Sequence, residues 1–238
     1  MKSLAELNVQ IFADGADMAA MLELYRQPHI KGFTTNPTLM RKAGITDYGA
    51  FSREVLERIP DRSLSLEVFA DDLEEMERQA RVIAAWGNNV YVKIPVTNTA
   101  GEPTADLVRR LSRDGLKLNV TALMTIEQVR EVDEALQGGA PAYVSVFAGR
   151  VADTGRDPVP IMTEAVRVLA AGSGAELIWA SPRELLNVFQ ADAIGCHIIT
   201  ATSDILNKLA LIQKDLTEYS LETVKMFRRD ALSSGFTL

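Results

Sequence analysis

The sequence is poor in the residues from which metal sites and disulfide frameworks are built. It contains one cysteine, Cys196, and two histidines among 238 residues. One cysteine cannot form an intramolecular disulfide and is typical of a protein from a reducing compartment. One cysteine and two histidines do not provide the four ligands of a conventional structural zinc site. We therefore expect a cytoplasmic protein without a metal site.

Basic clusters and long apolar runs are also missing. The formal net charge is −7, whereas binding to nucleic-acid phosphates needs clustered lysine and arginine. No apolar run approaches the roughly 18 to 20 residues that span a bilayer, and the N-terminus lacks the pattern of a signal peptide. We expect neither a nucleic-acid nor a membrane partner. A small anionic substrate would have to be held by a few local arginines.

Short apolar runs alternate with amphipathic helical segments along the chain. Parallel strands need a connecting element between them, so eight such runs favour an α/β fold with a single (β/α)8 TIM barrel. An open Rossmann sheet is the alternative, but FADGADMA after the first run lacks G-x-G-x-x-G. We expect one domain over residues 1–238, with an additional helix and tail from about residue 216. The tail, which contains Phe236, is expected to pack back on the domain, to clasp a neighbouring molecule or to fray.

The expected strands and helices follow from these two periodicities. The expected strands are Leu7–Phe12, Lys31–Thr34, Leu64–Phe69, Val90–Ile94, Leu116–Val120, Ala142–Phe147, Glu176–Ala180 and His197–Thr200, and the expected helices include Asp72–Trp86, Pro103–Asp114, Thr125–Leu136, Pro158–Ala171 and Leu221–Leu232.

Polar side chains stand at or near the end of almost every expected strand. In barrels of this type the chemistry lies at the C-terminal ends of the strands, because the connecting loops meet there. Polar groups that serve only to contact solvent would instead lie on loops and on the outer faces of helices. The residues at these positions are Asp14, Thr34, Thr35, Asn36, Glu67, Lys93, Asn119, Thr121, Ser145, Ser181 and Thr200.

Lys93 lies inside the apolar strand NNVYVKIPVT. Lysine is rarely buried without a partner or a function. Burial disfavours an ammonium group, and a neutral amine can attack a ketone to form an iminium that permits cleavage of a neighbouring carbon–carbon bond. The alternative is structural, with the ammonium reaching the strand end or pairing with Glu67 or Asp14. The strand pattern does not separate these two interpretations.

Three further residues suit the iminium interpretation. Asp14 and Glu67 are expected on nearby strands, where a carboxylate can transfer the protons that imine formation and bond cleavage require. Both carboxylates are equally suited to a structural ion pair with the lysine. Thr121 is placed to hold a water beside Glu67, although a β-branched residue is also ordinary in a strand.

Other polar residues are placed to hold a substrate. Arg150 and Arg183 follow the sixth and seventh expected strands, where loops often bind phosphate, and arginine matches phosphate oxygens with two parallel hydrogen bonds. Ser181 adds a hydroxyl donor beside them. A surface ion pair is the ordinary role of a single arginine, but the matching placement of two favours an anion site. Asn36 and Asn119 suit hydrogen bonds to substrate hydroxyls or an end-of-strand role.

Several motifs in this order make the chain similar to a known family. They are FADGAD, GFTTNPTLM, SLEV, VYVKIPVT, LNVTAL, YVSVFAGRVAD, WASPREL and SLETVKMFRRDALSSGF. The chain resembles small-type transaldolases of the transaldolase and fructose-6-phosphate aldolase family over essentially its whole length. The resemblance implies a class I aldolase-type enzyme of the pentose phosphate pathway that acts on sugar phosphates and needs no cofactor. It also implies a homo-oligomer, either a pentamer or a decamer.

The resemblance further implies a role for each candidate residue. Lys93 would form the Schiff base and Asp14 would be the acid and base of bond cleavage. Glu67 and Thr121 would hold the catalytic water. The remaining residues would bind substrate, with Thr35, Asn36, Asn119 and Ser145 around the dihydroxyacetone unit, Arg150, Ser181 and Arg183 at the phosphate, and Thr34 and Phe147 elsewhere in the substrate site.

Two positions separate transfer from simple aldol cleavage. The similar aldolase subgroup typically has glutamine at the position of Glu67 and tyrosine at that of Phe147. Without a tyrosine hydroxyl the intermediate should wait for an aldehyde acceptor. We therefore expect transfer of dihydroxyacetone from a ketose phosphate, such as fructose 6-phosphate or sedoheptulose 7-phosphate, to an aldose phosphate. The alternatives are an aldolase acting on fructose 6-phosphate or a related, even sulfonated, ketose, and a catalytically silent scaffold.

Trp179 departs from this resemblance, because relatives usually carry a small residue there. Strand alternation predicts that Trp179 shares the face of Ser181, where it would fill the barrel or narrow the pocket.

Overall fold

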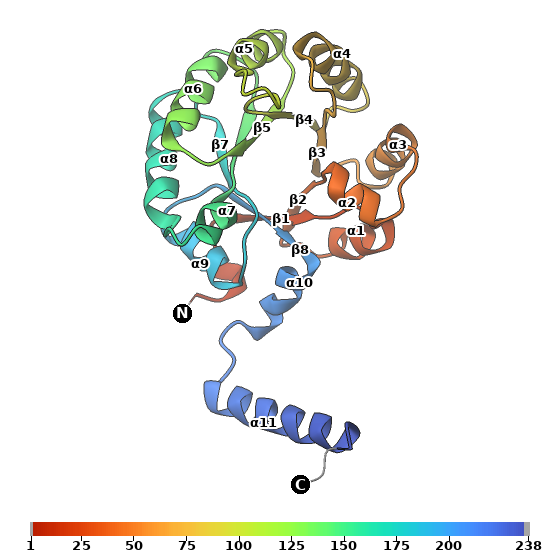
Figure 1. The fold of residues 1–238 in the computed structure, drawn as a ribbon, viewed down its shortest axis with the longest axis vertical. Helices are drawn as coiled ribbons and strands as arrows, with labels where there is room; N and C mark the ends of the chain where they lie inside the picture. Colours follow the sequence, from red (N-terminus) through yellow and green to blue (C-terminus); the bar gives the residue numbers. More distant parts are fainter. Residues whose placement is uncertain (1, 236–238) are drawn as a thin grey trace.

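The computed structural model describes residues 2–235, and its centre is a closed barrel of eight parallel strands (Figure 1). Each strand pairs with the next along the chain, and the last returns to the first. The predicted (β/α)8 barrel is therefore confirmed. The strands are β1 (Gln10–Asp14), β2 (Ile30–Thr34), β3 (Ser63–Glu67), β4 (Val90–Pro95), β5 (Leu118–Leu123), β6 (Ala142–Val146), β7 (Glu176–Trp179) and β8 (Ile198–Thr202).

Helices surround the barrel and provide the crossovers that parallel strands require (Figure 1). The four helices expected within the barrel are confirmed to within a few residues at each end. The helical elements are η1 (Leu4–Glu6), α1 (Met18–Tyr25), α2 (Pro37–Lys42), α3 (Tyr48–Arg58), α4 (Leu73–Ala84), α5 (Ala105–Arg113), α6 (Ile126–Leu136), α7 (Ala148–Asp153), α8 (Val159–Ala171), α9 (Leu186–Ala193), α10 (Ser203–Leu206), η2 (Asn207–Leu211) and α11 (Leu216–Ser233).

Two apolar clusters separate the outside of the barrel wall from its interior. Val92 and Ile94 of β4 are fully buried in the larger cluster, which packs between strands and helices. The smaller cluster fills the barrel and contains Phe12, Tyr143 and Ile178. Because side chains alternate along a strand, the neighbours of Val92 and Ile94 face the interior. This alternation turns Lys93 inward.

The first strand begins three residues later than the sequence pattern predicts. The expected span was Leu7–Phe12, but β1 covers Gln10–Asp14. The backbone amides of Asn8 and Val9 donate to Asp192 Oδ1 at 2.6 and 3.2 Å, so this segment is bound to the end of α9 instead of the sheet. Leu7 therefore packs against the core without belonging to a strand.

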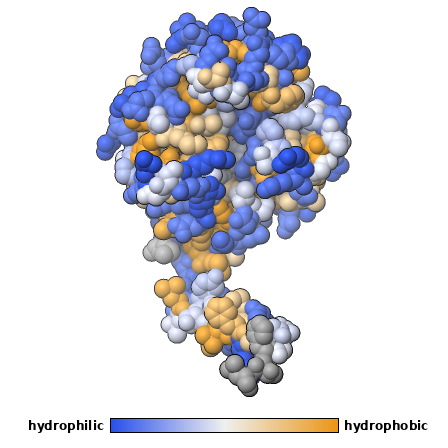
Figure 2. Space-filling view, viewed as in Figure 1, coloured by the Kyte–Doolittle hydropathy of each residue, from blue (hydrophilic) through white to orange (hydrophobic). Residues whose placement is uncertain are grey.

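Helix α11 stands apart from the barrel in Figure 1, and none of its residues is buried. It begins where Asp215 accepts hydrogen bonds from the Thr217 and Glu218 amides, so it is longer than the expected Leu221–Leu232. The expected tail with Phe236 lies outside the described residues. Figure 2 shows apolar side chains on this helix, and they include Leu216, Tyr219, Leu221, Val224, Met226, Phe227 and Leu232.

Within residues 2–235, no helix is both long enough and apolar enough to cross a membrane.

Candidate active site

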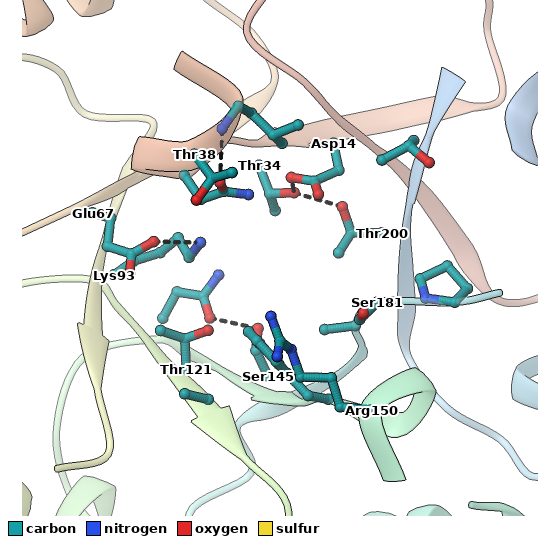
Figure 3. A pocket seen from close by; sticks show the side chains of 18 of the residues that line it. Asp14, Thr34, Thr38, Glu67, Lys93, Thr121, Ser145, Arg150, Ser181 and Thr200 are labelled. Atoms are coloured by element: carbon teal, nitrogen blue, oxygen red, sulfur yellow. Dashed lines mark hydrogen bonds and ion pairs between the residues drawn. The ribbon is translucent and has the colours of Figure 1, made fainter. Parts of the chain in front are cut away.

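A cavity of about 610 Å³ opens at the C-terminal ends of the strands. Figure 3 shows the side chains of residues that surround it. Of the residues predicted for the site, all except Thr35 line this cavity. The predicted residues that line it are Asp14, Thr34, Asn36, Glu67, Lys93, Asn119, Thr121, Ser145, Phe147, Arg150, Ser181 and Arg183.

Lys93 is held by two oxygen atoms at the floor of the cavity. Its Nζ lies 2.9 Å from Glu67 Oε2 and donates to the Thr35 carbonyl oxygen at 2.8 Å. The ion pair arises because β3 and β4 pair Glu67 directly with Lys93. Only 7% of Lys93 is exposed. The ion pair between Lys93 and Glu67 that a structural role predicts is therefore present. The same pair also places a carboxylate next to the amine, as iminium chemistry requires.

Thr35 has a different position from the one predicted for a substrate ligand. Its hydroxyl donates to the Ser65 carbonyl oxygen at 3.2 Å, and the residue is fully buried. Strand β2 ends at Thr34, whose side chain does face the cavity. Consecutive residues at the end of an extended segment point to opposite sides, so Thr35 contributes its carbonyl group and not its hydroxyl.

Asp14 lies on the side of the cavity formed by β1, β2 and β8 (Figure 3). The Thr34 hydroxyl donates to Asp14 Oδ1 at 2.7 Å, and a second hydroxyl, that of Thr200, lies 2.6 Å from Thr34 Oγ1. Burial raises the pKa of the Asp14 carboxyl, and the nearby Lys93 charge and the Thr34 hydrogen bond only partly oppose this. A carboxyl with a raised pKa exchanges protons closer to neutral pH, as acid–base catalysis requires.

A chain of hydrogen bonds fixes the polar groups of β5 and β6. Asn119 Nδ2 donates to Ser65 Oγ at 3.0 Å, and Ser145 Oγ donates to Asn119 Oδ1 at 2.7 Å. These partners set the orientation of the amide. The Thr121 hydroxyl is buried and has no hydrogen-bond partner among the described residues. Buried hydroxyl groups are normally paired, so Thr121 has unused capacity for a water or a substrate oxygen.

Unusual backbone conformations occur at the cavity wall. In residues 2–235, the residues other than glycine with positive φ are Ala122 (68°), Ser181 (58°) and Gln213 (63°). The first two line the cavity. Ala122 lies where the pairing of β5 with β6 shifts register. Such conformations are costly for L-residues and occur preferentially at functional sites.

The two arginines and the serine that the sequence predicts to bind an anion lie together at the cavity wall, and we name them the anion-binding cluster after that prediction (Arg150, Ser181 and Arg183). In Figure 3, Arg150 and Ser181 lie across the cavity from Glu67 and Lys93. The Arg150 guanidinium lies 5.8 Å from the centre of the Phe147 ring. Arg183 donates from Nε at 3.0 Å and from Nη2 to the Asp153 carboxylate. One arginine is thus already paired, and the other forms no ion pair with a described residue.

The position predicted for Trp179 is wrong. Trp179 is fully buried in the cluster between strands and helices, and it does not line the cavity. Its neighbours Ile178 and Ala180 belong to the interior cluster. Alternation does not extend to Ser181, because β7 ends at Trp179 and the backbone of Ser181 is left-handed.

Sequence reasoning missed the contribution of helix α2 to the cavity. Pro37, Thr38 and Lys42 line its rim, beside the predicted Asn36. Asn36 caps this helix, because its Oδ1 accepts a hydrogen bond from the Leu39 amide at 2.9 Å. An asparagine followed by proline directly after a strand is a helix-start signal, and it would have placed a helix at the mouth of the barrel.

The chain matches a family described as Transaldolase/Fructose-6-phosphate aldolase over residues 11–237. The chain belongs to this family. Similar proteins named "Probable transaldolase" include one from Dehalococcoides mccartyi, 34% identical over 211 residues that cover 88% of this chain and 93% of the relative. One from Methanococcus maripaludis is 34% identical and covers 90% and 94%. One from Streptococcus equi subsp. zooepidemicus is 34% identical and covers 93% and 97%.

A solved structure supports the fold of this family member. The crystal structure of a lyase/mutase candidate from Burkholderia cenocepacia superposes with a TM-score of 0.59, covering 98% of this chain and 88% of that one. Its sequence identity is 14%, so this similarity concerns the fold alone. The resemblance deduced from the motifs is confirmed, and homology assigns the chain to a family of transaldolase and aldolase enzymes.

Proposed function

We propose that this enzyme is a transaldolase that moves a dihydroxyacetone unit from a ketose phosphate to an aldose phosphate through a Schiff base on Lys93. One observation carries the proposal. Lys93 projects into the cavity at the C-terminal end of the barrel, in contact with Glu67 and facing a carboxyl of raised pKa on Asp14. A nucleophilic amine, an adjacent base and a second acid–base group are the parts that iminium chemistry requires.

The first half of the reaction cleaves the donor. Glu67 accepts a proton from the Lys93 ammonium, and the free amine adds to the ketone carbon. Glu67 returns this proton to the hydroxyl of the resulting carbinolamine, which leaves as water and gives an iminium. The Asp14 carboxylate removes the proton of the donor's C4 hydroxyl, the C3–C4 bond breaks, and its electron pair moves into the iminium to form an enamine. The shortened aldose leaves as an aldehyde.

The second half repeats these steps in reverse. The enamine carbon attacks the aldehyde carbon of the acceptor, and protonated Asp14 returns its proton to the new alkoxide. Water then adds to the iminium and releases the product from Lys93. The unpaired Thr121 hydroxyl supports a water at this position beside Glu67. Because the iminium itself accepts the electrons, we propose that no metal or organic cofactor takes part.

The walls of the cavity suit a phosphorylated sugar. Asn36, Asn119 and Ser145 offer hydrogen-bonding groups for the hydroxyls of the dihydroxyacetone unit. The anion-binding cluster lies across the cavity from Lys93, where the far end of an extended sugar would reach. Arginine binds phosphate through charge-assisted hydrogen bonds, which are stronger than neutral ones.

We propose transfer and not release of free dihydroxyacetone, because Phe147 has no hydroxyl to deliver a proton to the enamine. The discriminating assay supplies fructose 6-phosphate with and without an aldose phosphate acceptor. Transfer requires that cleavage beyond one equivalent per site depends on the acceptor. Sustained release of dihydroxyacetone without acceptor would identify an aldolase instead.

Borohydride trapping tests the covalent step. The enzyme is mixed with fructose 6-phosphate, reduced, digested and mapped by mass spectrometry. The expected adduct is a reduced imine on the peptide containing Lys93, and it should disappear in Lys93→Met. Lys117→Met is the matched control, because Lys117 belongs to the N-terminal side of the barrel and should leave the adduct unchanged. An adduct on another lysine, or none during turnover, contradicts the proposal.

We also propose that the enzyme works in the cytoplasm as a homo-oligomer, without nucleic-acid or membrane partners. The resemblance implies a pentamer or a decamer. Association as such is supported by helix α11, because none of its residues is buried and several of its exposed side chains are apolar. Exposed apolar surface of this extent is typical of protein–protein contacts.

A further inference from the structure

Helix α7 lies against the loop that carries Ser181 and Arg183, and Gly149 forms the contact. A Cβ atom built on Gly149 would lie 1.5 Å from the Ser181 carbonyl oxygen and 2.7 Å from the Ser181 carbonyl carbon. Both are backbone atoms, which cannot rotate away as the tip of a side chain can. Any residue larger than glycine therefore displaces either the helix or the loop.

The loop beyond this contact has a backbone conformation that needs support. Ser181 has a φ of 58°, which is uncommon for residues other than glycine. Such a conformation persists only where surrounding contacts hold it. The amide of Gly149 also donates to the Ala180 carbonyl oxygen at 3.4 Å, directly before Ser181. The close approach of α7 to the Ser181 backbone thus helps to hold this residue in its left-handed conformation.

The other end of the same helix holds the side chain of Arg183. Asp153, the last residue of α7, accepts hydrogen bonds from Nε and Nη2 of Arg183. This fork occupies one edge of the guanidinium and leaves the Nη1 side available to an anion. Asn187 Oδ1 fixes the Arg183 amide at 2.8 Å. The remaining member of the anion-binding cluster, Arg150, belongs to α7 itself.

We propose that α7 is a positioning element for the anion-binding cluster and acts through two residues that do not line the cavity, Gly149 and Asp153. Gly149 sets the depth at which Ser181 meets the helix, and Asp153 sets the direction of Arg183. Together they fix both residues relative to Arg150. The inference rests on the proposed function, because the anion is taken to be the phosphate of the sugar substrate.

Asp153 also carries a negative charge near the anion, which by itself would weaken anion binding. Its side chain is 53% exposed, so solvent and salt screen this repulsion over roughly 8 Å at physiological ionic strength. Loss of the fork, in contrast, frees a long side chain with many rotamers. We therefore expect the loss of orientation to outweigh the gain in charge, and replacement of Asp153 to weaken anion binding.

The test compares phosphorylated and unphosphorylated donors. Fructose 6-phosphate and fructose are assayed with one aldehyde acceptor at about 0.15 M salt, and inorganic phosphate is titrated as a competitive inhibitor. The variants are Gly149→Ala and Asp153→Asn. Ala152→Ser is the control for a change elsewhere on α7, and Glu164→Gln removes another exposed ion pair, with Arg130. Arg150→Ala serves as the reference for loss of an anion ligand.

The expected result is a selective loss. In Gly149→Ala, the kcat/KM ratio of fructose 6-phosphate to fructose should fall by about tenfold or more. In Asp153→Asn it should fall by about threefold to fivefold, the fold-change that corresponds to the loss of a half-exposed ion pair. The inhibition constant of inorganic phosphate should rise in parallel, while kcat with saturating fructose changes less than about twofold, since uniform binding affects KM and not kcat. Neither control should alter the ratio.

Several outcomes would overturn the inference. Equal losses with both donors would mean that α7 serves only the fold, and an unchanged ratio would mean that it does not position the cluster. Tighter phosphate binding in Asp153→Asn would show that this carboxylate competes with the anion. If Gly149→Ala does not fold, Asp153→Asn decides the matter, because it leaves the number of non-hydrogen atoms unchanged. A wild-type enzyme that shows no preference for fructose 6-phosphate, with Arg150→Ala unchanged, would instead refute the phosphate site of the proposed function.

Discussion

Glu67 and Lys93 face each other from paired positions of β3 and β4, with Lys93 Nζ 2.9 Å from Glu67 Oε2. The side chains are 20% and 9% exposed, so the pair is mostly shielded from solvent. A shielded ion pair is costly to break from one side, because the remaining charge loses its partner. In the proposed reaction, Glu67 also serves as the base nearest to the amine.

Replacement of Glu67 by glutamine should separate these two contributions. Glu67→Gln keeps the shape and one acceptor oxygen but removes the charge, so we expect a loss of stability of about 1 to 3 kcal/mol, below the range for a fully buried pair. Loss of a positioned proton acceptor should lower kcat by about 10²-fold or more. Thermal denaturation and steady-state kinetics measure the two effects. A variant with wild-type kcat would remove Glu67 from the proposed mechanism.

The raised pKa of Asp14 predicts an opposite pH trend for stability from that of an ordinary aspartate. The folded state favours the protonated form, so the stabilising contribution is complete below about pH 4, near the unfolded-state pKa, and is lost as the pH rises through the folded-state pKa. Asp14→Asn should therefore raise the melting temperature at pH 7 to 8 and have little effect near pH 4. Asp106→Asn, at a side chain that is 85% exposed, should not show this pattern.

The same shift predicts the acidic limb of the rate profile. If Asp14 must be ionised to start cleavage, the decline of kcat/KM on acidification should begin above the usual aspartate range, because the folded-state pKa is raised. A decline of kcat/KM that begins only at about pH 4 or below would argue against the Asp14 carboxyl as the base.

Cys196 should be inert to thiol reagents in the native protein. It is 3% exposed, and burial raises its pKa to about 12. Thiolate is the reactive form, so modification at pH 8 should require unfolding. Iodoacetamide labelling followed by mass spectrometry should show no adduct in native buffer and complete labelling in denaturant. Rapid labelling under native conditions would contradict the burial of this thiol.

The apolar side of α11 should mediate association between copies. Val224 is 59% exposed and Phe227 63% exposed. Val224→Glu combined with Phe227→Glu should dissociate the assembly in light-scattering measurements and leave the circular dichroism of the barrel unchanged. Lys225→Glu, on the same helix, introduces a similar charge change at an already charged position and should have no such effect. A wild-type protein that is monomeric at micromolar concentration would refute the proposed oligomer.

The sequence was sufficient to predict the barrel and most of the residues that line the cavity. Parallel strands share one chemical end, so polar residues that close successive apolar runs must converge, and Glu67, Lys93 and Asn119 stand side by side in register. Their convergence needs no knowledge of loop structure. The motif order then added the identity of the family.

The failures occur where a strand ends or where contacts are remote in sequence. Thr35 was assigned to the cavity from its place at a strand end and from the family resemblance, but its side chain points away just beyond the last residue of β2. Trp179 was assigned by alternation, which stops at the last residue of β7. The fork between Asp153 and Arg183 joins residues thirty positions apart, and no local pattern indicates it. The contact that excludes a larger residue at Gly149 depends on the position of the Ser181 carbonyl group in the loop after β7.

The aromatic filling of the barrel has a consequence for the order of events. Tyr91 and Tyr143 stack with ring centres 3.9 Å apart, and Phe12 packs against Tyr143, so the interior is blocked below the cavity. Every molecule must then enter and leave through the same opening. In the proposed transfer the three-carbon unit stays on Lys93 while both aldoses use this opening, so we expect a double-displacement sequence, in which the first aldose departs before the acceptor arrives. Initial velocities should give parallel double-reciprocal lines, and the acceptor at high concentration should compete with the donor.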